Sequence, residues 1–81
     1  KTARERVASF IVALARRRQL GPEQPLELPM GRADIADYLG LTIETVSRTL
    51  TLLRKQRLIE LDDRHSLRIR QPAALAAVAG F

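Results

Sequence analysis

The sequence predicts a mainly α-helical fold with a small β-hairpin, arranged as a winged helix-turn-helix that occupies residues 1–81 as one domain. Two short helical patterns joined by a turn at Gly40 predict a helix-turn-helix over about residues 31–56. Two alternating apolar and polar segments over about residues 58–70 predict a hairpin, or wing, after it. An amphipathic helical pattern over residues 2–18 precedes both.

Length and composition restrict the class of protein. Eighty-one residues suffice for one domain with a modest core. The net charge of +5 favours a polyanionic partner, and the chain has no cysteine for disulfides or thiolate metal sites. No motif predicts a cofactor. No membrane span or signal peptide is visible, so we expect a cytoplasmic protein. Because Lys1 opens directly into a helical pattern, we expect a piece of a longer chain.

The first predicted helix covers residues 2–18. Thr2 and Glu5 match a capping box, in which two side chains satisfy backbone N–H groups at the helix start. Arg16 to Arg18 lie in the last turn, where positive charge favours the helix dipole, and we expect a solvated helix end there. The apolar face repeats at helical spacing and comprises Ala3, Val7, Phe10, Ile11 and Leu14.

A loop and a short strand connect this helix to the next. Gly21 and Pro22 break the helical pattern, and Leu26 to Leu28 alternates as in a strand. The leading helix of the helix-turn-helix then runs from Arg32 to Leu39. The Tyr38 ring on this helix could lie at the helix–helix boundary or bond a phosphate, and we expect it to pack on the core.

The second helix is predicted from Ile43 to about Gln56. Gly40 can adopt a positive φ and so ends the leading helix, and Thr42 is a suitable N-cap for the next one. At about 100° per residue, one stripe of this helix is apolar and must face a core. The stripe consists of Val46, Leu50 and Leu53.

The opposite face of the second helix is polar. Glu44, Ser47 and Arg48 project together from its first two turns, which enter the DNA major groove in this motif. Arg48 can donate two hydrogen bonds to guanine, and Glu44 can accept from a cytosine or adenine amino group. Ser47 can bond a base or phosphate or approach a thymine methyl group. The alternative is that Glu44 and Arg48 form a solvent-exposed ion pair at i,i+4 spacing.

The predicted wing follows the second helix. Leu58 to Leu61 and Ser66 to Arg70 alternate like two strands, with Leu67 and Ile69 inward and Arg68 and Arg70 outward. Asp62 and Asp63 in the turn between them are interpreted as hydrogen-bonding turn residues rather than a catalytic pair. A short helix from Pro72 to Ala79, anchored by Leu75 and Val78, ends the chain.

Cationic and hydroxyl side chains near the second helix and the wing are candidates for contacts to the DNA backbone. The leading helix crosses the backbone in this motif, although an ordinary surface arginine is an equal interpretation of Arg32. His65 has no triad or metal-ligand partners, and we interpret it as an exposed turn residue. The candidates are Arg32, Thr42, Thr45, Thr51, Arg64 and His65.

The run from Asp34 to Leu50, DIADYLGLTIETVSRTL, resembles the DNA-binding domain of the CRP/FNR superfamily of bacterial transcription regulators. The combination of Glu44 with Ser47 and Arg48 is similar to the motif of the FNR/FixK branch. Members of the CRP branch typically have glycine at the position of Ser47. The segment from Leu28 to Thr42 and the hairpin also fit FixK-type proteins.

The resemblance implies a sequence-specific DNA-binding domain of a transcription activator. Glu44 and Arg48 would read the G·C pair of a TTGAT-like half-site in double-stranded DNA, with Ser47 near the thymines. It also implies a full-length homodimer formed through an absent N-terminal region, and contact with RNA polymerase through about Gln19 to Glu27.

Two other classes of function stay open at this point. The same fold can serve as a protein–protein interaction module without DNA specificity, in which Glu44 and Arg48 are charges at the rim. An enzyme is the least favoured class, because the sequence offers no nucleophile–base pair and no metal spacing.

Overall fold

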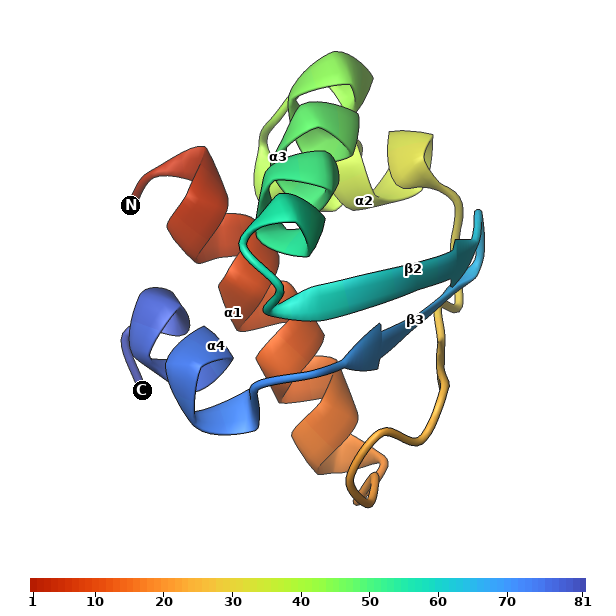
Figure 1. Cartoon of the computed structure of the whole chain (residues 1–81). Coiled ribbons are helices and arrows are strands. Elements are labelled where there is room, and N and C mark those ends of the chain that lie inside the picture. Colours follow the sequence, from red (N-terminus) through yellow and green to blue (C-terminus); the bar gives the residue numbers. More distant parts are fainter.

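Four helices and a three-stranded antiparallel sheet make up the chain in the computed structural model, which describes residues 1–81 (Figure 1). This arrangement confirms the predicted winged helix-turn-helix. No helix combines the length and the apolar character needed to cross a lipid bilayer. The elements are α1 (Ala3–Arg17), β1 (Leu26–Glu27), α2 (Arg32–Leu39), α3 (Ile43–Lys55), β2 (Ile59–Asp63), β3 (Ser66–Ile69) and α4 (Pro72–Ala79).

The first helix begins at the predicted capping box. The Glu5 backbone N–H donates to Thr2 Oγ1 at 3.1 Å, and the Thr2 backbone N–H donates to Glu5 Oε1 at 2.8 Å. The buried face of α1 differs from the predicted one, because Ala8 and Val12 are also buried whereas Ala3 and Phe10 are only partly covered. α1 packs against both α3 and α4, so it lies at the centre of the fold (Figure 1).

The sheet has the order β1-β3-β2, so the hairpin is extended by a third strand. β1 pairs with β3 in antiparallel register, with Leu26 opposite Leu67 and Glu27 opposite Ser66. The Leu28 N–H donates to the His65 carbonyl at 2.7 Å, so the segment before α2 is fixed to the end of the wing. The sequence predicts the strand at Leu26 but not its pairing with β3.

The core lies between α1, the inner face of the sheet and the inner sides of α3 and α4. Burial of its apolar side chains supplies the main driving force for folding. Pro72 begins α4, as predicted, but Ala79 is buried beside Leu75 whereas Val78 is only partly covered. The largest fully buried side chains are Ile11, Leu26, Leu53, Ile59, Leu67, Leu75, Val7 and Val46.

Tyr38 does not pack in the core, and this prediction was wrong. Its side chain is 72% exposed on the outer side of α2. The ring makes one aromatic contact, with Phe10 of α1, at a centroid distance of 6.0 Å and an interplanar angle of 60°. Ile35 and Ala36 fill the buried side of this short helix, so no core position remains for residue 38.

Candidate nucleic-acid interface

The turn between α2 and α3 sets the angle at which α3 is presented. Gly40 adopts the left-handed conformation at φ 71°, as predicted, and the Leu41 N–H donates to the Ala36 carbonyl at 2.8 Å. Arg6 of α1 donates from Nη1 to the Leu39 carbonyl at 3.1 Å. A helix end leaves carbonyls without partners, so Arg6 both satisfies one of them and ties the turn to α1.

The first turn of α3 is closed by two of the predicted backbone-contact residues. Thr42 Oγ1 accepts a hydrogen bond from the Thr45 N–H at 3.1 Å, which confirms the predicted N-cap. The Thr42 hydroxyl also donates to Thr45 Oγ1 at 2.9 Å. Both hydroxyls therefore lie at the positive end of the α3 dipole, where anions are stabilised.

The buried stripe of α3 is the predicted one. Val46, Leu50 and Leu53 are buried against the core, and Thr49 is buried beside them with only 7% of its surface exposed. This packing fixes the rotation of α3 about its axis. Because the axial rotation is fixed, the identity of the outward-facing residues is fixed as well.

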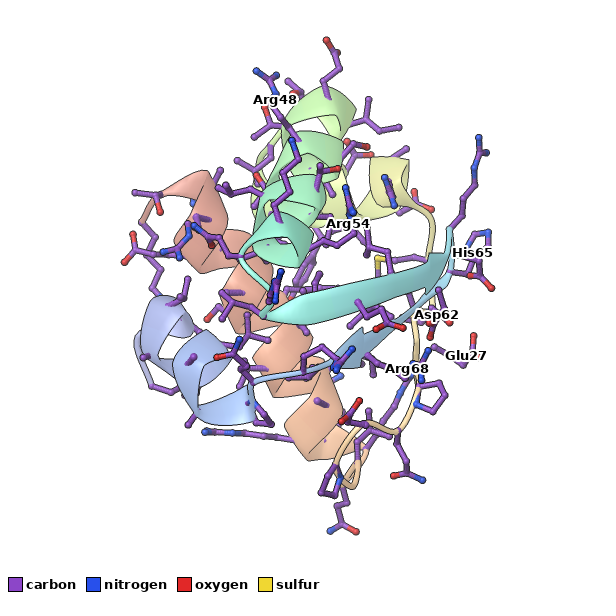
Figure 2. The ribbon with its side chains drawn as sticks, in the orientation of Figure 1. Glu27, Arg48, Arg54, Asp62, His65 and Arg68 are labelled. Atoms are coloured by element: carbon purple, nitrogen blue, oxygen red, sulfur yellow. The ribbon has the colours of Figure 1, made fainter.

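Glu44 and Arg48 are both exposed on the outward face of α3. Arg48 projects away from the body of the molecule (Figure 2). All ion pairs of the structure lie elsewhere, on the sheet and the loop before it, so the alternative of a Glu44–Arg48 ion pair is not realised. Both charged groups are available to a ligand.

Ser47 lies half-buried beside this pair and is not free. Arg32, the first residue of α2, donates from Nη1 to Ser47 Oγ at 3.3 Å. The guanidinium of Arg32 is thus partly buried against α3, and its Nε is covered and has no hydrogen-bond partner. Thr51 is half-buried one turn further along α3.

The tip of the wing carries the two other predicted backbone contacts. Arg64 and His65 form the turn between β2 and β3, and both are exposed, with His65 visible at the tip in Figure 2. The His65 N–H donates to Asp63 Oδ1 at 2.7 Å. Asp63, the last residue of β2, thus hydrogen-bonds the turn as predicted, whereas Asp62 lies within β2 and bonds Arg68 instead.

The outer face of the sheet is electrically balanced, although it holds two arginines. Arg68 Nη2 lies 2.8 Å from carboxylate oxygens of both Glu60 and Asp62. Arg70 lies 2.5 Å from Glu60 and 3.2 Å from Glu23. The hydrogen bond from Arg68 lowers the pKa of the Asp62 carboxyl, and the same bond raises the pKa of Arg68. The unpaired positive charge of the wing is thus at its tip, on Arg64.

Sequence reasoning missed a link between α1 and the end of α3. Arg4 donates from Nη2 and Nε to Gln56 Oε1, at 2.9 Å and 3.2 Å, across 52 positions of sequence. This bond places a cation beside the last turn of α3. No local spacing signals such a contact, because it exists only once the helices have packed.

These features define a winged helix-turn-helix nucleic-acid-binding domain, in which the rotation of α3 is fixed, Glu44 and Arg48 are exposed without ion pairs, and the wing tip is cationic. The chain belongs to the Crp-like helix-turn-helix domain family, whose model matches residues 5–78. This family supplies the DNA-binding domains of CRP/FNR transcription regulators, so the resemblance predicted from Glu44, Ser47 and Arg48 is confirmed.

Two similar proteins belong to the FixK branch. The chain is 51% identical to the nitrogen fixation regulation protein FixK of Rhizobium meliloti over 74 residues, which are 91% of this chain and 34% of that protein. It is 50% identical to FixK of Azorhizobium caulinodans over 78 residues, 93% of this chain and 32% of that one. Both relatives are named as nitrogen fixation regulation proteins.

The fold agrees with a solved structure from the same branch. FixK2 from Bradyrhizobium japonicum superimposes with a TM-score of 0.86 at 42% identity, covering 96% of this chain and 38% of that one. The chain therefore spans about a third of the length of the curated relatives it matches.

Proposed function

We propose that the chain is the sequence-specific DNA-binding domain of a FixK-like transcription activator. One observation carries this proposal: Glu44 and Arg48 are exposed, unpaired and adjacent to Ser47 on the outward face of a helix whose rotation the core fixes. A helix presented in this way fits the major groove, where base edges differ in their donors and acceptors.

Glu44, Ser47 and Arg48 read a TTGAT-like half-site in this proposal. Arg48 donates to guanine O6 and N7, and Glu44 accepts from an amino group of the same G·C pair or its neighbour. Ser47 lies near the thymines. The support is the identity of these three residues in a chain that belongs to the CRP/FNR superfamily.

Five of the other candidate residues hold the DNA backbone. Thr42 and Thr45 lie at the N-terminus of α3, where backbone dipoles favour a phosphate. Arg64 is an exposed cation at the wing tip, next to His65. Thr51 flanks the reading residues on α3. Such contacts position a protein on DNA without distinguishing sequences. Arg32, the sixth candidate, already donates a hydrogen bond to Ser47 at 3.3 Å.

In the whole regulator, two copies of this domain bind a pseudo-palindrome, as a homodimer formed through other segments. Half-site centres about 34 Å apart would match two such domains.

The loop from Gln19 to Glu27 contacts RNA polymerase in this proposal. Its support is that residues 21–25 of this segment are exposed. Substitutions in this loop should abolish activation and leave DNA binding intact.

Fluorescence anisotropy tests the half-site. The chain is titrated onto a labelled TTGAT-type palindrome and onto a scrambled duplex, at one fixed salt concentration. We expect clear preference for the palindrome, with weak affinity, about micromolar, because one module lacks the avidity of a dimer. Equal, salt-sensitive binding would retain DNA binding but refute the half-site. No binding to either duplex at low salt would favour the protein-contact alternative.

A further inference from the structure

We infer that Arg32 is a specificity-determining residue that acts on base reading through Ser47. The inference rests on the proposed function and assigns Arg32 a role that differs from holding a phosphate. Arg32 opens α2 and Ser47 lies in the second turn of α3, so their hydrogen bond at 3.3 Å joins the two helices of the motif beside the reading face.

The chemistry of the two groups fixes the direction of this hydrogen bond. A guanidinium has only N–H donors, whereas a serine hydroxyl has one donor and two acceptor lone pairs. Ser47 must therefore accept from Arg32. Its own O–H is then left to be donated outward, and the charged donor polarises the hydroxyl and strengthens that second bond.

A hydroxyl held in this way is selective among bases. It can donate to thymine O4, to guanine O6 or N7, or to adenine N7, whereas cytosine presents only an amino donor at this edge. Because Arg32 occupies one of the two acceptor lone pairs and orients the hydroxyl, donation is favoured over acceptance. Arg32 thus shifts the preference of Ser47 toward thymine over cytosine.

Arg32 is half-buried, and its contribution to stability is expected to be small. Its Nε is covered and makes no hydrogen bond, and a buried donor without a partner destabilises a fold. A methionine would keep the apolar stem of Arg32 and remove the unsatisfied donor. Arg32→Met is therefore expected to leave the melting temperature unchanged or to raise it.

The test is a double-mutant cycle of Arg32→Met and Ser47→Ala measured by DNA binding. Two palindromes are compared, one with thymine at the positions nearest Ser47 and one with 5-methylcytosine, which keeps the methyl group and replaces the 4-oxo acceptor by an amino group. Each single variant should reduce the preference for thymine by roughly three- to tenfold, the value of one ordinary hydrogen bond. The double variant should lose no more than either single variant.

Arg64→Ala is the matched control, because it also removes one positive charge. It should weaken binding to both duplexes equally and keep the preference for thymine. If Arg32→Met behaves like Arg64→Ala, Arg32 is a phosphate contact and the inference is wrong. Additive losses in the double variant would equally overturn it.

A second measurement needs no DNA, so it separates this inference from the half-site assignment. Three-bond NMR couplings report the χ1 rotamer of Ser47 in the free chain. We expect one rotamer in the wild type and in Arg64→Ala, and averaged rotamers in Arg32→Met. An unchanged Ser47 rotamer in Arg32→Met would refute the positioning role even if the chain binds its palindrome as proposed.

Discussion

Replacing Arg48 with alanine should separate base reading from folding. The Arg48 side chain is exposed and forms no ion pair within the chain, so its removal should change the free energy of unfolding by no more than about 0.5 kcal/mol. A bidentate arginine–guanine contact contributes about 1–3 kcal/mol of discrimination against the wrong base. At about 1.4 kcal/mol per tenfold, this corresponds to roughly five- to 150-fold.

The assay compares two duplexes that differ only at the G·C pair of the half-site. Wild-type protein should prefer the G·C duplex, and Arg48→Ala should bind both with nearly equal affinity. Arg64→Ala serves as the charge-matched comparison and should weaken both to the same extent, with a shallower salt dependence. If Arg48→Ala weakened both duplexes equally and kept the preference, Arg48 would be a backbone contact and the assignment would fail.

Three further predictions concern the scaffold of the site. Gly40→Ser should lower the free energy of unfolding in urea by about 1–2 kcal/mol, because φ 71° lies in the left-handed region. Gly31→Ser is the control: its φ is −73° and no atom lies within 4 Å of an added Cβ, so it should be neutral or slightly stabilising. Equal losses in the two variants would contradict this reasoning. Thr42→Ala should cost about 1 kcal/mol through the lost cap, and an unchanged melting temperature would refute the cap's role. The pKa of the Asp62 carboxyl is lowered because Arg68 donates a hydrogen bond to it. Its stabilising contribution is therefore present above the pKa of the unfolded chain, near 3.8, and is lost as the pH falls through the lower pKa of the folded state. Asp62→Asn should therefore flatten the pH dependence of the melting temperature below about pH 5, and an unaltered acid dependence would count against it.

Most of the helical fold could be predicted because its signals are local. The capping box at Thr2 and Glu5, the left-handed Gly40 and the N-cap Thr42 each act within a few residues of their own position. The rotation of α3 follows from the spacing of its apolar residues, so the helical periodicity alone places Glu44 and Arg48 on the outward face.

The remaining features depend on contacts between distant parts of the chain. The pairing of Leu26 with Leu67 and the bond from Arg6 to the Leu39 carbonyl form only when the helices and the sheet have packed. The prediction for Tyr38 failed because burial also depends on which side of a helix meets the rest of the fold. Only the side of α2 that carries Ile35 and Ala36 is buried, and the polar end of the Tyr38 ring tolerates exposure. The orientation of Arg32 toward Ser47 also has no signature in the spacing of these residues.

Chemical-shift mapping of the 81-residue chain would show most directly whether α3 reads DNA. Backbone amide shifts are recorded while a TTGAT-type palindrome and a scrambled duplex are added in turn. We predict the largest shifts in the first two turns of α3, around Glu44 and Arg48, and at the wing tip around Arg64. Those at α3 should differ between the two duplexes. Shifts confined to α4 or to the outer face of the sheet, or identical shifts with both duplexes, would contradict base reading by α3.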